Sequence, residues 1–195
     1  KFNAFYIDGC KAYYNAIRTV FGESVAIQYD YFHVMQNVWK KLWKWALDRR
    51  RRTQERAEAS GTPWYRKKLE ALAKSLWQNR YLIFKADDRM SEQERAKLAE
   101  LVEAECHVGR LRAFLSGVWD LFDNSADEAQ AREALARLKL LPVERDHPEQ
   151  FEKVVSYLEK HFEWMTAYLR HDRVRRNSLA ESGMRVLRRL EVEHD

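Results

Sequence analysis

The chain has 195 residues, of which 46% are hydrophobic and 33% are charged, and its formal net charge is +5. Three Pro and six Gly supply too few turn-forming residues for an all-β protein, so we expect helices to dominate. The basic excess suits a polyanionic partner without requiring one, because most charges on helices form a solvated face.

The two cysteines, Cys10 and Cys106, lie far apart in the sequence. They have no neighbours at metal-ligand spacing, so we expect reduced thiols in an intracellular protein. No apolar run approaches the length of a membrane span, and the N-terminus lacks a signal-peptide pattern. These features predict a cytoplasmic protein without a membrane partner. The abrupt start in a strand and end in a helix suggest a piece of a longer protein.

Two short segments, 3–8 and 24–30, are rich in aromatic and aliphatic residues and each ends on an aspartate, which predicts two β-strands. Residues 9–22 carry apolar side chains at near-helical spacing and close on Gly22, a plausible helix C-cap. Strand, helix and strand together predict a βαβ unit with parallel strands. Two strands do not make a stable sheet alone, so we expect further strands from elsewhere.

The remainder is predicted to be helical. The expected helices cover residues 31–59, 64–80, 91–122, 129–141 and 149–171, with a last helix after 175–178. Ser91 with Glu94, and Ser125 with Glu128, each predict a capping box. The fold class is therefore mainly α, with a partial α/β core and a large all-helical insertion. We expect three parts: 1–60 with the core and a long helix, 61–170 as the helical insertion, and 171–195 as a helix that returns to the core.

Asp8 and Asp30 each follow a predicted strand, and groups at the carboxyl ends of parallel strands face the crevice where ligands bind. Either aspartate could equally cap the helix that follows it. His33 lies one turn after Asp30, so it could bind a metal, orient Asp30 by a hydrogen bond, or pack behind it.

Glu181, Arg185 and Arg188 fall on one face of the last predicted helix, separate from its apolar face. The ordinary interpretation is a surface ion pair. The functional interpretation is a carboxylate metal ligand with guanidinium groups that hold phosphate. Phosphodiester cleavage by two metal ions needs such converging acids, and Mg²⁺ prefers their oxygen atoms.

Three stretches resemble bacterial insertion-sequence transposases of the DDE class. They are IDGCKAYYNAIRTVFGESVAIQYDYFHVMQN (7–37), LWQNRYLIFKADDRMSEQERAKLAEL (76–101) and RRNSLAESGMRVLRRLE (175–191). The resemblance covers nearly the whole chain and implies an RNase H-like catalytic domain with a helical insertion before the catalytic Glu. It also implies DNA cleavage and strand transfer with Mg²⁺ or Mn²⁺.

Carried across by position, Asp8 matches the second catalytic acid and metal ligand of this family, and Glu181 matches the third. Asp30 and His33 match a signature that supports the site without binding the metal directly. The first catalytic Asp of the family lies on an earlier strand that has no counterpart after Lys1. We therefore expect the 195-residue chain alone to be unable to catalyse strand transfer.

The resemblance implies DNA as the partner, both transposon ends and target, together with self-association. The basic residues expected to contact phosphates are Lys40, Lys41, Lys44, Arg49, Arg50, Arg51, Arg52, Arg175, Arg176, Arg185 and Arg188. Trp39 and Trp43 share a helical face and are expected in the core, whereas Trp45 points elsewhere and is the better candidate for an exposed role. Two alternatives remain: a non-enzymatic helical DNA- or protein-binding remnant of a transposase, and a helical bundle unrelated to DNA.

Overall fold

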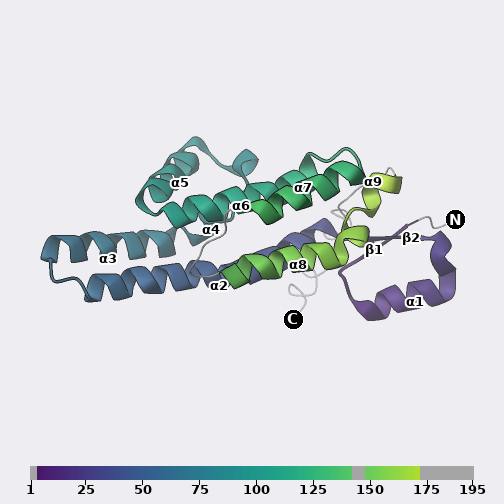
Figure 1. The fold of residues 1–195 in the computed structure, drawn as a ribbon, viewed down its shortest axis with the longest axis horizontal. Coiled ribbons are helices and arrows are strands. Elements are labelled where there is room, and N and C mark those ends of the chain that lie inside the picture. The colour runs from purple at the N-terminus through teal and green to yellow at the C-terminus, as the bar shows by residue number, and fades with distance from the viewer. Residues whose placement is uncertain (1–3, 142–147, 172–195) are drawn as a thin grey trace, which may run out of the picture. The chain divides into compact units, whose positions relative to one another are not determined.

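The computed structural model describes residues 4–141 and 148–171, which form two compact units. The sheet unit contains the described residues of 4–37 and 161–171, and the helical unit contains those of 38–160. The boundaries fall inside two helices, α2 (Tyr31–Glu58) and α8 (Pro148–Met165). The protein is mainly α with a small α/β core, as the sequence predicts (Figure 1).

The sheet unit contains the predicted βαβ arrangement. Strand β1 (Ala4–Ile7) pairs in parallel with β2 (Ala26–Tyr29), in a register from Ala4 opposite Ala26 to Ile7 opposite Tyr29. Helix α1 (Lys11–Phe21) and the short helix η1 (Gly22–Ser24) connect the strands (Figure 1). The parallel register brings the carboxyl ends of both strands to the same edge, where Asp8 and Asp30 follow them.

Helix α1 presents apolar side chains to solvent. None of its residues is buried, and Tyr13, Val20 and Phe21 are 60%, 71% and 42% exposed. The apolar spacing thus predicts the helix correctly, and among the described residues its apolar face is covered only in part, by Phe5 against Phe21 and by Trp164 against Tyr14.

The chain returns to the sheet unit through the end of α8 and through α9 (Ala167–His171). The sequence predicts one helix here, but the helix breaks at Thr166, which is fully buried and donates its hydroxyl proton to the Phe162 carbonyl, 2.8 Å away. Such bonding to the preceding turn competes with regular helix geometry, which accounts for a break that apolar spacing cannot reveal.

The helical unit begins with two antiparallel helices. Helix α2 ends before the Ser-Gly-Thr turn at 60–62, and α3 (Pro63–Gln78) starts with proline in its first turn, where the missing N–H is not needed. Contacts of Arg56 with Tyr65 and of Arg50 with Trp77 run in opposite sequence order along the two helices. Figure 1 shows the ribbons of α2 and α3 side by side. The predicted boundaries at 59 and 64 are correct to within one residue.

The stretch predicted as one helix over 91–122 is two helices, α5 (Glu92–Ala104) and α6 (Cys106–Asp123). The predicted capping box at Ser91 is present: Ser91 Oγ accepts from the Glu94 N–H at 3.2 Å, and Glu94 accepts from the Ser91 N–H at 2.8 Å. The chain then leaves helical geometry at Glu105 (φ −142°, ψ 96°), whose side chain is buried and caps α6. The apolar pattern continues through this break, which explains why the prediction of one helix is wrong.

The capping box predicted at Ser125 and Glu128 is also wrong. Helix α7 (Glu128–Leu140) is capped by Asp127, whose carboxylate accepts from the Gln130 N–H at 2.8 Å. Two adjacent candidates, Ser125 and Asp127, compete for this role, and an aspartate is also favoured by the positive end of the helix dipole.

An aromatic cluster lies in the core of the helical unit. Trp45 is 1% exposed and meets the Phe151 ring edge-on at 6.3 Å, and Phe151 meets Phe114 at 4.9 Å. The expectation that Trp45 has an exposed role is therefore wrong. Trp39, expected in the core, is 39% exposed.

Arg112 of α6 holds the segment between α4 (Arg80–Ile83) and α5. It donates to the carbonyls of Ile83 and Lys85 at 3.2 and 2.6 Å and pairs with Asp87 of η2 (Asp87–Arg89). Burial lowers the pKa of Arg112, and Asp87 partly opposes this shift. Since the side chain is only 9% exposed, these polar contacts replace the water that it has lost.

The described helices include none that is long and apolar enough to cross a membrane. Both cysteines are free and exposed, in agreement with the predicted thiols.

Candidate functional site

Asp8 lies immediately after β1, and its side chain is exposed. Its Oδ1 accepts a hydrogen bond from the Cys10 N–H at 3.0 Å, which fixes the carboxylate at the turn into α1. Gly9 makes this turn with φ +87°, and a Cβ built on it would lie 2.1 Å from the Tyr29 hydroxyl oxygen. Only glycine fits here, because the backbone is left-handed and the buried Tyr29 ring lies against it.

Asp30 lies beside the end of β1. Its N–H donates to the Ile7 carbonyl at 2.9 Å, which continues the parallel pairing one residue past β2. Its side chain is 5% exposed, and Oδ1 accepts from the Phe32 N–H at 2.8 Å. Asp30 therefore caps the start of α2, the structural role weighed from sequence, and it follows the strand adjacent to the one that carries Asp8.

His33 is half-buried on the first turn of α2. Its ring meets Phe32 edge-on at 5.5 Å, and its carbonyl accepts from the Asn37 side chain at 3.0 Å. Asn37 also donates to the Tyr29 hydroxyl at 3.4 Å. These contacts connect the first turn of α2 to the tyrosine that lies against Gly9, one residue from Asp8.

The donor set at this edge suits a hydrated Mg²⁺ or Mn²⁺ in part. The exposed Asp8 carboxylate can bind a cation that keeps most of its waters. Asp8, Asp30 and His33 do not form a group with ligating atoms within 4.8 Å of one another; among the described residues such a group of three is found elsewhere. The other predicted site residues of the last segment, Glu181, Arg175, Arg176, Arg185 and Arg188, lie outside the described residues.

Gln28 attaches the returning chain to β2, a contact that sequence reasoning missed. Its amide nitrogen donates to the Met165 carbonyl at 3.0 Å, and its oxygen accepts from the Tyr168 N–H at 2.7 Å. Nearby, Trp164 stacks on Tyr14 of α1 at 4.5 Å. The sequence does contain a signal for this contact, which is a polar amide in an otherwise apolar strand. A buried glutamine needs hydrogen-bond partners for all its polar atoms. Gln28 thereby fixes the residues that directly precede 172–195 to the strand next to β1.

The predicted phosphate-binding residues of α2 differ in their surroundings. Lys40 and Lys44 are exposed, and Lys41 lies 4.8 Å from the centre of the Tyr157 ring. Arg51 is exposed and lies within 4.0 Å of acids on its own helix. Arg49, by contrast, is 6% exposed and pairs with Glu105 at 3.5 Å, so its guanidinium is engaged inside the helical unit.

The Trp77 ring makes cation–π contacts with two arginines from different helices. Arg50 of α2 and Arg80 of α4 lie 4.8 and 4.0 Å from the centre of its ring. Arg80 also lies 4.5 Å from the centre of the Tyr81 ring, and Tyr81 is 66% exposed. Arg50 was predicted to contact DNA, whereas Arg80 and the role of Trp77 were missed because the cluster forms only when α2 and α3 lie side by side.

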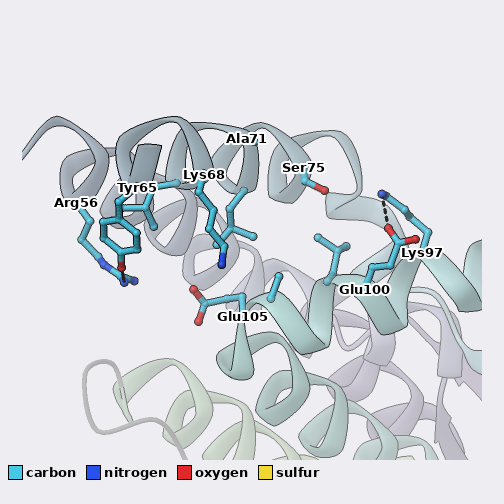
Figure 2. A pocket seen from close by; sticks show the side chains of 12 residues that line it. Arg56, Tyr65, Lys68, Ala71, Ser75, Lys97, Glu100 and Glu105 are labelled. Carbon is cyan, nitrogen blue, oxygen red and sulfur yellow. Dashed lines mark hydrogen bonds and ion pairs between the residues drawn. The ribbon is translucent and has the colours of Figure 1, made fainter. Parts of the chain in front are cut away.

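A pocket of about 380 Å³ lies between α2, α3 and α5. Figure 2 shows the Glu105 carboxylate pointing into it, with Lys68 on the opposite wall. At one end Lys97 pairs with Glu100 at 2.7 Å (Figure 2). The pocket gives solvent a route to the buried junction between α5 and α6.

Glu105, Cys106 and His107 lie at this junction, and their ligating atoms are all within 4.8 Å of one another. The sequence shows no metal-ligand spacing around Cys106, whereas the structure brings three potential ligand types together there. Consecutive residues are seldom ligands together on a helix, because they point in different directions. Glu105 lies outside the helix with an extended backbone, so its carboxylate can lie beside the ligating atoms of Cys106 and His107.

Comparison with known proteins gives a match to the model of one family, described as Transposase (DDE_Tnp_ISL3), over residues 1–190. No curated protein and no solved structure matches the chain. The matched range covers both described units and the segment that carries Glu181.

Proposed function

The chain belongs to this transposase family, and we propose that it contributes Asp8 and Glu181 as carboxylate ligands of the metal-dependent centre that cuts and joins DNA. The observation that carries the proposal is the position of Asp8: an exposed carboxylate, fixed by the Cys10 N–H, at the carboxyl end of a parallel strand. Ligands of α/β proteins bind at this edge.

Bound Mg²⁺ or Mn²⁺ supplies activation of the attacking water or 3′-hydroxyl and stabilisation of the leaving oxygen. The residues of the chain fix the position of the carboxylate that would bind the metal. Asp8 offers an oxygen in a fixed position, because its turn is held by Cys10 and by the contact of Gly9 with Tyr29. Asp30 supports that position from the neighbouring strand by donating its N–H to Ile7.

Metal binding at Asp8 can be tested without catalysis. Mn²⁺ is paramagnetic and broadens the NMR signals of nearby amides, so titration of the ¹⁵N-labelled chain should first broaden the amides of residues 8–11. The Asp8→Asn variant should lose this effect. Asp88→Asn, which alters an exposed acid of the helical unit, should retain it. Equal broadening in wild type and Asp8→Asn would refute Asp8 as a ligand.

We further propose that the cluster of Trp77, Arg50, Arg80 and Tyr81 contacts the DNA backbone. A cation over an aromatic ring is stabilised by roughly 0.5–1 kcal/mol at exposed sites, which limits the motion of the guanidinium. Two guanidiniums held in this way lose little further freedom when they bind phosphate. The single observation in support is that one ring orients arginines from two helices.

The salt dependence of duplex binding tests this surface. Each phosphate contact contributes about 0.9 to the slope of log K against log salt, so Arg50→Ala with Arg80→Ala should reduce the slope by about 1.8. Arg110→Ala, at an exposed position of α6, should leave it unchanged. An unchanged slope in the double variant would exclude this surface. DNA binding by a chain that binds no Mn²⁺ at Asp8 would favour the alternative, a non-enzymatic DNA- or protein-binding protein.

A further inference from the structure

The junction between α5 and α6 holds a buried carboxylate in a fixed orientation. Glu105 is 5% exposed, and its Oε1 accepts from the His107 N–H at 3.4 Å and from Arg49 at 3.5 Å. Arg49 is itself 7% exposed in its side chain, so both partners are largely removed from water. A carboxylate held by a helix N-terminus and a guanidinium has little freedom to rotate.

A thiol and an imidazole lie beside this carboxylate. Cys106 and His107 are the first residues of α6, and their ligating atoms lie within 4.8 Å of each other and of a Glu105 oxygen. His107 Nε2 is 3.7 Å from Glu105 Oε1. In a tetrahedral site, nitrogen and oxygen ligands at about 2.0–2.2 Å from the metal are separated by roughly 3.3–3.6 Å. The imidazole and carboxylate are therefore within a few tenths of an ångström of that spacing.

We propose that Glu105, Cys106 and His107 form a binding site for Zn²⁺ or a divalent ion of the same class. Thiolate, imidazole and carboxylate together are ligands typical of zinc, whereas Mg²⁺ takes oxygen ligands almost exclusively. Three protein ligands leave the fourth tetrahedral position to water. On binding, the Cys106 thiol releases its proton to solvent and its sulfur forms the bond to the metal.

The surroundings suit this role. Arg49 donates to the proposed carboxylate ligand, and such an outer hydrogen bond commonly orients a metal ligand. It also places a positive charge near the ion, and the negative charges of the thiolate and the carboxylate reduce the repulsion between the two cations. Cys106 is exposed, and Glu105 lines the pocket of Figure 2, so the ion and its water have access. The residues belong to the helical unit, and the proposal does not depend on the metal chemistry of Asp8.

Cobalt(II) is the appropriate probe, because thiolate coordination produces a near-ultraviolet charge-transfer band that carboxylate sites lack. We expect the reduced, metal-free 195-residue chain to develop this band with one equivalent of Co²⁺, and Zn²⁺ to abolish it. The chain provides a matched control: Cys10 is also a free, exposed thiol, so Cys10→Ser should behave as wild type and Cys106→Ser should lose the band. His107→Ala should weaken Co²⁺ binding at least tenfold.

Any of three results would overturn the proposal: the wild type develops no thiolate band, the band survives Cys106→Ser, or the band disappears in Cys10→Ser. Because Cys106 is exposed, its replacement by serine should not unfold the protein, and an unchanged far-ultraviolet circular dichroism spectrum checks this. Loss of Mn²⁺ broadening near Asp8 would leave the cobalt result unaffected, so the two metal proposals fail independently.

Discussion

Replacement of Gly9 by alanine should disrupt the turn that positions Asp8. Gly9 has φ +87°, and its added Cβ would lie 2.1, 2.2 and 2.4 Å from Oη, Cζ and Cε2 of Tyr29. Contacts this short force either the turn or the ring to move, and Tyr29 is only 4% exposed. Gly22 is the matched control: it has φ +67°, but its added Cβ meets nothing within 4 Å.

The two glycines separate backbone strain from steric overlap. A side chain at such backbone angles costs on the order of 1–3 kcal/mol, which applies to both Gly9→Ala and Gly22→Ala. Overpacking against a buried ring adds about 1–3 kcal/mol, which applies to Gly9→Ala alone. We therefore expect Gly9→Ala to lower the free energy of opening of the sheet unit by about 1–3 kcal/mol more than Gly22→Ala does.

Hydrogen exchange measured by mass spectrometry on peptides from residues 4–37 reports this opening free energy separately from the helical unit. A double-mutant cycle identifies the cause, because Tyr29→Leu removes the three ring atoms that would clash. In that background Gly9→Ala should cost no more than Gly22→Ala. If the two alanine variants destabilise the wild-type chain equally, the reasoning about the Tyr29 contact is wrong.

Three further outcomes are expected. Arg112→Met leaves buried carbonyls without their donor and should lower the unfolding free energy by about 2–4 kcal/mol, whereas Arg110→Met on the exposed side of α6 should change it little in urea denaturation. The hydrogen bond from Lys85 holds the pKa of Glu94 below its usual 4.5, so its contribution is present above pH 4.5 and lost as the pH falls further; thermal melts should show this loss in wild type but not in Glu94→Gln. Gln28→Leu should speed amide exchange at the α8–α9 junction, and unchanged exchange there would contradict its role in attaching the returning chain.

The sequence predicted those features that depend on near neighbours. The turn at 60–62 and the capping box of Ser91 each follow from residues within a few positions of one another, and the βαβ unit follows from three consecutive segments that are each recognisable locally. Asp8 and Asp30 were expected at one sheet edge because parallel strands end together, and the parallel register bears this out. Their catalytic roles remain a proposal.

What the sequence did not predict depends on partners distant in the chain. No glycine or proline in the sequence marks the helix break at Glu105. The residue leaves helical geometry where its carboxylate accepts from Arg49, 56 positions earlier. Gln28 is informative only once Met165 and Tyr168, more than 130 positions later, are known to meet it. In both cases a buried polar group needs a partner, and the identity of that partner is a property of the fold.

The two proposed metal sites differ in what determines their affinity. Asp8 offers an exposed oxygen to a hydrated ion, so its affinity depends on further carboxylates brought to the same edge. Glu105, Cys106 and His107 offer three different ligand types from one short segment, so their affinity depends mainly on the backbone break that turns them toward each other. Zn²⁺ binds both oxygen and sulfur ligands, whereas Mg²⁺ does not compete for a thiolate. Excess Mg²⁺ should therefore displace Mn²⁺ from Asp8 and leave Co²⁺ at Cys106 in place, and that contrast distinguishes the two sites in the unmodified protein.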